Sequence, residues 1–126
     1  MAGELAALAY EKNRLIKAGR SDLADRVRHT SVVLGDGAGY DIDSFDESGN
    51  SLFIEVKTTR QGKFADFQIS PNEIVFSTRH PSDFALYRIY EFNTKTETGN
   101  FYVIQGDLTK HLDLKPTGYS ARLAQR

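Results

Sequence analysis

The sequence contains no cysteine, no tryptophan and only one methionine among its 126 residues. The absence of cysteine excludes disulfide scaffolds, thiol nucleophiles and cysteine-ligated zinc sites. No apolar run approaches the roughly 20 residues that a membrane-spanning helix needs. The start of the chain also lacks the basic residues and apolar block of a signal peptide. We therefore expect a cytoplasmic protein with no membrane partner.

The sequence also has no large excess of positive or negative residues. Its 16 Lys and Arg residues nearly balance its 17 Asp and Glu residues, for a net charge of −1. This balance argues against a polybasic protein that binds nucleic acid over its whole surface, but it permits contact at one site. There is no repeat, low-complexity tract or Pro/Gly/Ser-rich linker. With 40% hydrophobic and 26% charged residues, the chain fits one globular domain over residues 1–126, whole or excised from a longer protein.

What is present is a change of hydrophobic period along the chain. Apolar residues recur with helical spacing over residues 3–18, and a short second helix is expected at 22–28. Residues 40–45 and 51–58 instead alternate with a period of two around the polar, glycine-containing turn at 46–50. These two segments predict a β-hairpin.

The second half of the chain begins with a clear helix start at Ser70-Pro71-Asn72-Glu73. Serine caps, proline takes the first helical position and glutamate completes a capping box. Aromatic and β-branched strands follow at 84–92, apolar on both faces as in the middle of a sheet, and at 101–105. Residues 31–34 are either strand or loop, and 107–126 stay unassigned. The order predicts an α+β (or α/β) fold with a mixed central sheet flanked by helices.

The predicted hairpin brings charged residues together. Glu55 and Lys57 point to one face of their strand, and a turn centred on Ser48 would place Asp41 opposite Glu55. Two carboxylates about 5 Å apart repel each other unless one is protonated or a cation lies between them. Mg²⁺, with Mn²⁺ as a substitute, suits such a pair because it binds carboxylates, waters and phosphate oxygens. Lys57 could hold a water nucleophile or neutralise phosphate charge.

Plainer interpretations of the same residues stay open. Charged and apolar residues alternate in any half-exposed hairpin, and a Glu-x-Lys pair often forms a surface salt bridge worth about 0–1 kcal/mol. Asp43, on the same face as Asp41, is either an outer ligand or a solvated strand residue. A second carboxylate opposite Glu55, however, has no structural use without a cation, and this favours the metal site.

Several stretches resemble a known family, the C-terminal domain of the NO VEIN type, within the PD-(D/E)xK restriction-endonuclease-like nuclease superfamily. They are Tyr10-Glu11, Val27-Arg28-His29-Thr30-Ser31, Gly35-Asp36-Gly37-Ala38-Gly39-Tyr40-Asp41-Ile42, Ile54-Glu55-Val56-Lys57-Thr58-Thr59, Asn72-Glu73 and Leu86-Tyr87-Arg88-Ile89-Tyr90. The resemblance implies an αβββαβ core. The proline of the superfamily's name is absent, since Tyr40 stands in its place.

The resemblance also implies roles for individual residues. Asp41 and Glu55 resemble the metal ligands, Lys57 resembles the catalytic lysine, and Glu11 resembles a further metal ligand on the first helix. Without the resemblance, a surface pair with Arg14 is the simpler interpretation of Glu11. Glu73 is explained by capping alone.

Two functions follow as hypotheses. The first is Mg²⁺-dependent hydrolysis of DNA by an endonuclease domain of a restriction or defence system, acting as a homodimer or with a helicase or ATPase partner. The second is a catalytically inactive nuclease-fold module that binds nucleic acid or protein in a larger assembly.

Overall fold

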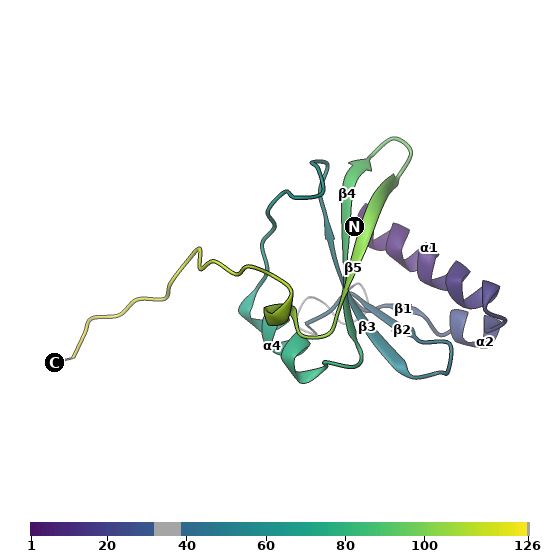
Figure 1. Ribbon diagram of the computed structural model, residues 1–126, viewed down its shortest axis with the longest axis horizontal. Coiled ribbons are helices and arrows are strands. Elements are labelled where there is room, and N and C mark those ends of the chain that lie inside the picture. Colours follow the sequence, from purple (N-terminus) through teal and green to yellow (C-terminus); the bar gives the residue numbers. More distant parts are fainter. Residues whose placement is uncertain (32–38, 126) are drawn as a thin grey trace.

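A mixed sheet organises the protein (Figure 1), whose computed structural model describes residues 1–31 and 39–125. The five-stranded sheet has helices packed on it, which confirms the predicted α+β class. Its elements are α1 (Ala2–Lys17), α2 (Ser21–Ala24), β1 (Arg28–His29), β2 (Ile42–Phe45), β3 (Ser51–Thr58), α4 (Pro71–Arg79), β4 (Phe84–Asn93), β5 (Thr98–Gln105) and the 3₁₀ turn η2 (Leu108–Lys110). Apart from Ser31, the segment predicted at 31–34 lies outside the described residues.

The strands lie in the order β1-β2-β3-β4-β5. All neighbours are antiparallel except β3 and β4, which run parallel. A parallel pair needs a crossover connection, and α4 provides it. β4 is buried over most of its length, as its two-sided apolar sequence predicts for a central strand.

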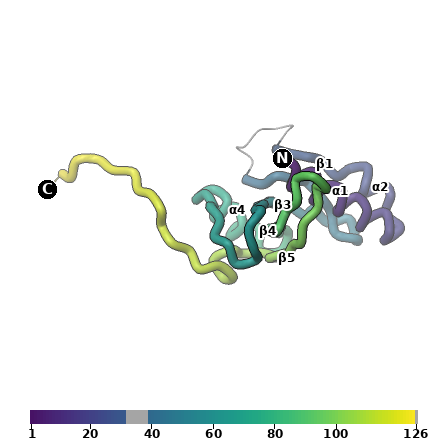
Figure 2. Tube along the Cα trace, turned by 90° about the horizontal axis from the view of Figure 1, so that it is seen from above, coloured from purple at the N-terminus to yellow at the C-terminus, as the bar shows by residue number. Residues whose placement is uncertain are grey.

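Helices cover both faces of the sheet. In Figure 2, α1 and α4 lie on opposite sides of the strands. The buried cluster under α1 and α2 contains Ala7, Leu15, Leu23, Ala24, Val27, Ile42, Phe45, Ile54, Val56, Ala85, Tyr87, Ile89 and Phe92. The cluster under α4 and η2 contains Phe84, Leu86 and Leu108, with Phe53, Phe67, Ile69, Phe76, Ile104 and Leu112 packed against it. The sheet is therefore the middle layer between two apolar cores.

The capping box of α4 is confirmed: the Ser70 hydroxyl accepts from the Glu73 amide, and the Glu73 carboxylate accepts from the Ser70 amide. The prediction for 22–28 was wrong in part. α2 ends at Ala24, and Arg28 belongs to β1, where it pairs with Asp43 of β2. An ion pair between these two side chains reinforces the strand pairing, so a long-range contact overrides the local helix signal.

The chain after η2 has no regular structure over residues 112–125 and runs away from the sheet (Figure 1). Its apolar residues Tyr119 and Leu123 are exposed. The folded body that positions the polar groups described next therefore ends near Leu112, which still packs against the second core cluster.

Candidate functional site

The hairpin of β2 and β3 has the register predicted from its turn. Asp43 pairs with Phe53 and Ile42 pairs with Ile54. The amide of Asp41 donates to the carbonyl of Ile54 at 2.8 Å, which continues the pairing one residue beyond β2. Asp41 therefore lies beside Glu55, and the polar turn before β3 sets this proximity through local sequence alone.

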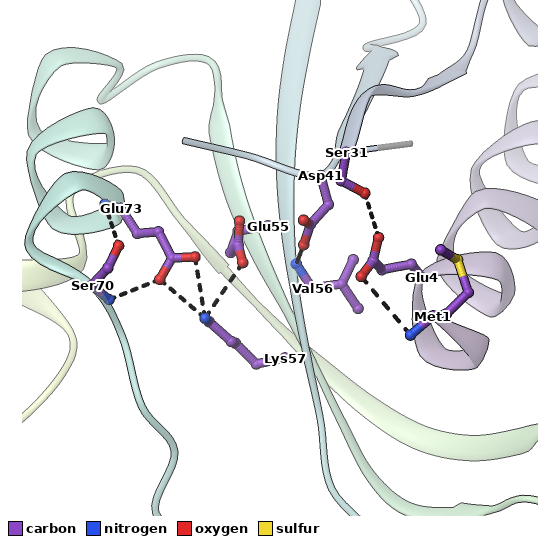
Figure 3. A network of polar contacts seen from close by, with 9 residues as sticks. All are labelled: Met1, Glu4, Ser31, Asp41, Glu55, Val56, Lys57, Ser70 and Glu73. Atoms are coloured by element: carbon purple, nitrogen blue, oxygen red, sulfur yellow. Dashed lines mark hydrogen bonds and ion pairs between the residues drawn. The ribbon is translucent and has the colours of Figure 1, made fainter. Parts of the chain in front are cut away.

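Asp41, Glu55 and Lys57 line one cavity of about 280 Å³. Its lining residues come from α1, β3, α4 and the segment before β2: Glu4, Gly39, Tyr40, Asp41, Glu55, Val56, Lys57, Ser70, Asn72 and Glu73. Figure 3 shows the carboxyl groups of Asp41 and Glu55 between Glu4 on one side and Glu73 on the other. The structure thus brings together three of the four predicted site residues.

Lys57 is held in place by carboxylates. Its Nζ donates to both carboxylate oxygens of Glu73, at 3.0 and 3.2 Å, and lies 3.5 Å from Oε1 of Glu55. Although burial alone would lower the pKa of Lys57, the hydrogen bond with the Glu73 carboxylate and the negative charge of that carboxylate help to outweigh it, and the pKa is raised. The lysine is a fixed cation at the wall of the cavity.

Glu55 is nearly inaccessible, with 4% of its surface exposed. Burial, the hydrogen bond with Glu73 and the negative charge of Asp41 together raise the pKa of Glu55 to about 10. Burial also raises the pKa of Asp41, against the opposing effect of the Val56 amide that donates to it at 2.8 Å. Carboxyl groups crowded in this way take up a proton unless a cation replaces it.

The carboxylate of Glu73 accepts hydrogen bonds from Glu55 and Lys57. Burial would raise the pKa of Glu73, but hydrogen bonds from Glu55, the Ser70 amide and Lys57 lower it. The sequence pattern explains Glu73 by capping alone, and the structure shows that the same carboxylate also fixes Lys57. The available signal was its place in the Asn72-Glu73 stretch of the family resemblance.

Glu4, which the sequence analysis did not single out, reaches the cavity from the first turn of α1. Its Oε1 lies 2.7 Å from His29 Nε2 and accepts from the Ser31 hydroxyl at 2.6 Å. Burial would raise the pKa of Glu4, but these two hydrogen bonds outweigh it and lower that pKa. The negative charge of Glu4 in turn contributes to the raised pKa of Asp41.

Glu11, the fourth predicted site residue, does not reach this cavity. It is fully buried, and its carboxylate accepts from Arg14, Ser44 and the Tyr87 hydroxyl. The pair with Arg14 is present, but in the interior rather than at the surface. Glu4 precedes Glu11 by seven residues, so both lie on one helix face about 10 Å apart along the axis. Glu4, and not Glu11, is therefore the carboxylate of α1 that lines the cavity.

Asp43 also lies apart, because it accepts from Arg28 at 2.9 Å and from the Thr30 hydroxyl at 2.6 Å. In the described part of the chain, no three acidic or histidine side chains are arranged to hold a metal ion by themselves. Mg²⁺ commonly binds through one or two carboxylates, with waters and substrate phosphates completing the shell. The donor pair of Asp41 and Glu55 fits that mode of binding.

The comparisons with known proteins give one match. The family model described as Protein NO VEIN, C-terminal matches residues 3–104, which includes every lining residue of the cavity. Among curated proteins and among solved structures, nothing matches the chain. Within the described residues, no helix is long and apolar enough to cross a membrane.

Proposed function

The chain belongs to the family of NO VEIN C-terminal domains, and from this premise we propose that it is a metal-dependent phosphodiesterase that cleaves DNA. The proposal includes a place in the PD-(D/E)xK nuclease superfamily and a role in a restriction or defence system. The observation that carries it is the convergence of Asp41, Glu55 and Lys57 in one cavity. Two neighbouring buried carboxyl groups with raised pKa values, beside a fixed ammonium group, suit a divalent cation and a phosphate.

Asp41 and Glu55 would hold the cation, Mg²⁺ or Mn²⁺. When bound, the metal supplies Lewis acidity toward a phosphate oxygen and lowers the pKa of a water molecule. Glu55 must release its proton to act as a ligand, since its pKa lies near 10 without a cation. Lys57 offsets negative charge on the phosphate or orients the attacking water. Glu73 restricts Lys57 to the position where that charge develops, which removes the reorganisation a free lysine would need.

The first test is cleavage of DNA in Mg²⁺ by Lys57→Ala and by Glu55→Gln. Both variants should lose at least about 100-fold in rate, the range typical of a positioned charge or proton-transfer group. The matched control is Lys12→Ala, which removes an exposed lysine from α1 and should leave the rate unchanged. A Lys57→Ala protein that cuts as fast as the parent would remove the assigned role.

The second test is direct binding of Mn²⁺ measured by calorimetry. Asp41→Asn should weaken binding by at least about 10-fold, whereas Asp22→Asn, at an exposed position on α2, should not. The experiment also separates a second candidate function, an inactive nuclease-fold module that binds nucleic acid or protein. One observation favours that candidate: the ammonium group of Lys57 is already engaged by Glu73 and Glu55. Absence of Mn²⁺ binding in the parent protein would support it.

A further inference from the structure

The loop between β3 and α4, residues 59–70, starts and ends at the cavity. The loop begins two residues after Lys57 and ends at Ser70. Lys57 and Ser70 both line the cavity. At its tip, the Ala65 amide donates to the Gly62 carbonyl at 3.1 Å, so Lys63 and Phe64 are the central residues of a tight turn. The two ends of the loop therefore lie at walls of the same cavity.

Phe64 is an unusual residue for such a position. Turn centres are typically Gly, Pro, Asn, Asp or Ser, and Phe64 brings an aromatic ring that is 91% exposed. The ammonium group of Lys63 lies 5.6 Å from the centre of that ring. Arg60, a few residues earlier, is exposed as well. The first half of the loop therefore offers a flat apolar ring together with two cations, and one exposed carboxylate, Asp66, follows the turn.

The start of the loop is hydrogen-bonded to the end of β4. Amides of Glu91 and Phe92, at the end of β4, donate to carbonyls of Gln61 and Thr59 at 2.8 and 3.1 Å. These bonds keep the start of the loop beside β4. The tip is therefore joined to a segment whose backbone is already held against the sheet, which lowers the entropy cost of fixing that segment when a ligand binds.

Arg88 of β4 supports the second half of the loop. It is 1% exposed, donates to the Ala65 carbonyl at 3.1 Å, and places its guanidinium 4.6 Å from the centre of the Phe67 ring. Among the described residues, none of the ion pairs includes Arg88, and its buried Nε has no hydrogen-bond partner. Arg88 is the register neighbour of Lys57, so two cations lie side by side on adjacent strands.

We propose that the 59–70 loop binds a single-stranded segment of nucleic acid, with Phe64 stacked on an unpaired base and Lys63 and Arg60 on the adjoining phosphates. Stacking on an aromatic ring combined with a positive backbone track is the usual chemistry of single-strand recognition. The loop leads the strand to Lys57 and the acid pair. The inference rests on the proposed function, because it names the substrate form that the same cavity receives.

The test is the affinity for a fluorescein-labelled oligothymidine strand of about 12 nucleotides, measured by anisotropy in EDTA so that cleavage plays no part. Phe64→Ala should weaken binding by about 5- to 100-fold, and Phe64→Trp should restore it. Lys63→Ala should flatten the dependence of log Kd on log salt concentration by about 0.7, whereas Phe64→Ala should leave that slope unchanged. Phe101→Ala, at a partly exposed aromatic of β5 that packs on Tyr10 and Tyr87, and Lys12→Ala, at an exposed position of α1, serve as controls.

The inference is overturned if Phe64→Ala binds the strand as tightly as the parent, or if the Phe101 control loses as much affinity. It is also overturned if the parent protein prefers duplex of the same length. Its failure differs from failure of the proposed function. If DNA is cut equally well with and without Phe64, the nuclease proposal stands and the loop proposal fails. If the parent binds the strand through Phe64 but does not cut it in Mg²⁺, the loop proposal stands and the nuclease proposal fails.

Discussion

At the scale of single residues, Glu73 joins two tasks that are usually separate. One carboxylate oxygen accepts from the Ser70 amide and completes the start of α4, and both oxygens accept from Lys57. Sequence reasoning found the first task because a capping box is a local pattern. It did not find the second, because the contact joins residues that only the folded chain brings together.

Replacing Glu73 with Gln should separate these tasks. Glutamine retains an oxygen that accepts from the Ser70 amide, but it cannot hold Lys57 as an ion pair. We expect kcat for DNA cleavage to fall by about 10-fold with little change in KM. A lysine that is no longer held in one position should stabilise the transition state less, while its effect on substrate binding stays small. Steady-state kinetics decide the matter. An unchanged kcat would show that Lys57 needs no anchor.

Glu55 makes the stability of the metal-free protein depend on pH. The pKa of about 10 in the folded state lies above the ordinary value of 4.5, so the folded form retains a proton that the unfolded chain releases. This stabilisation is complete below about pH 4.5 and is lost as the pH rises toward 10, by at most about 1.4 kcal/mol per pH unit.

Glu55→Gln has no such proton to lose, so its stability relative to the parent should increase steadily between about pH 5 and pH 9. Urea unfolding of both proteins in EDTA across that range provides the measurement. Parallel curves would mean that Glu55 is ionised in the folded protein. Addition of Mn²⁺ should reduce the difference, because a cation takes the place of the proton.

At the scale of elements, the hairpin and the capped helix were predictable, whereas the approach of α1 was not. The register of β2 on β3 follows from a five-residue turn, and it alone places Asp41 beside Glu55. Which turn of α1 meets the cavity depends on how far the helix slides along the sheet. Hydrophobic spacing defines the inward face of a helix but not its position along its axis. Hydrophobic spacing therefore gives no sign that Glu4 reaches the cavity, and Glu11, singled out by the family resemblance, lies about two turns further along the helix.

Gly3 sets the position of α1. A Cβ at this residue would lie 1.9 Å from Oγ1 and 2.9 Å from Cβ of Thr58, at the end of β3. Gly3→Ala should therefore push the first turn of α1, with Glu4, away from the cavity and cost about 1–3 kcal/mol in the free energy of unfolding. Gly118→Ala, in open space on the tail, is the control and should change little. Equal stability of both variants in urea would contradict this packing.

Ser70→Ala tests the start of α4 without touching Lys57. Loss of the side-chain cap should cost about 1 kcal/mol in the free energy of unfolding, since the Glu73 amide loses its acceptor. Denaturant unfolding should show this cost while the cleavage rate per folded molecule stays close to that of the parent. The pattern is the reverse of that expected for Glu73→Gln, so the two variants control for each other.

At the scale of the whole molecule, the sheet and its two apolar cores account for the folded body, and the tail contributes little to it. Residues 113–125 are exposed, with a surface hydrogen bond from the Thr117 hydroxyl to the Gln68 side chain. A chain ending at Leu112 should unfold within about 0.5 kcal/mol of the full chain. A larger loss would indicate that the tail packs on the body in solution. The sequence left this segment unassigned because it carries neither helical nor strand periodicity.

The parallel pairing of β3 with β4 has a consequence for the order in which the site assembles. Asp41 and Glu55 are brought together by a short hairpin, whose loop closes at low entropic cost. Glu73 and Arg88 reach their positions only after the crossover through α4 has formed and β4 has paired with β3. The acid pair can thus form early in folding, and the anchored lysine and the supported loop come last. The hairpin should accordingly show high φ-values and α4 low ones, so chemical competence would be acquired in the final step of folding.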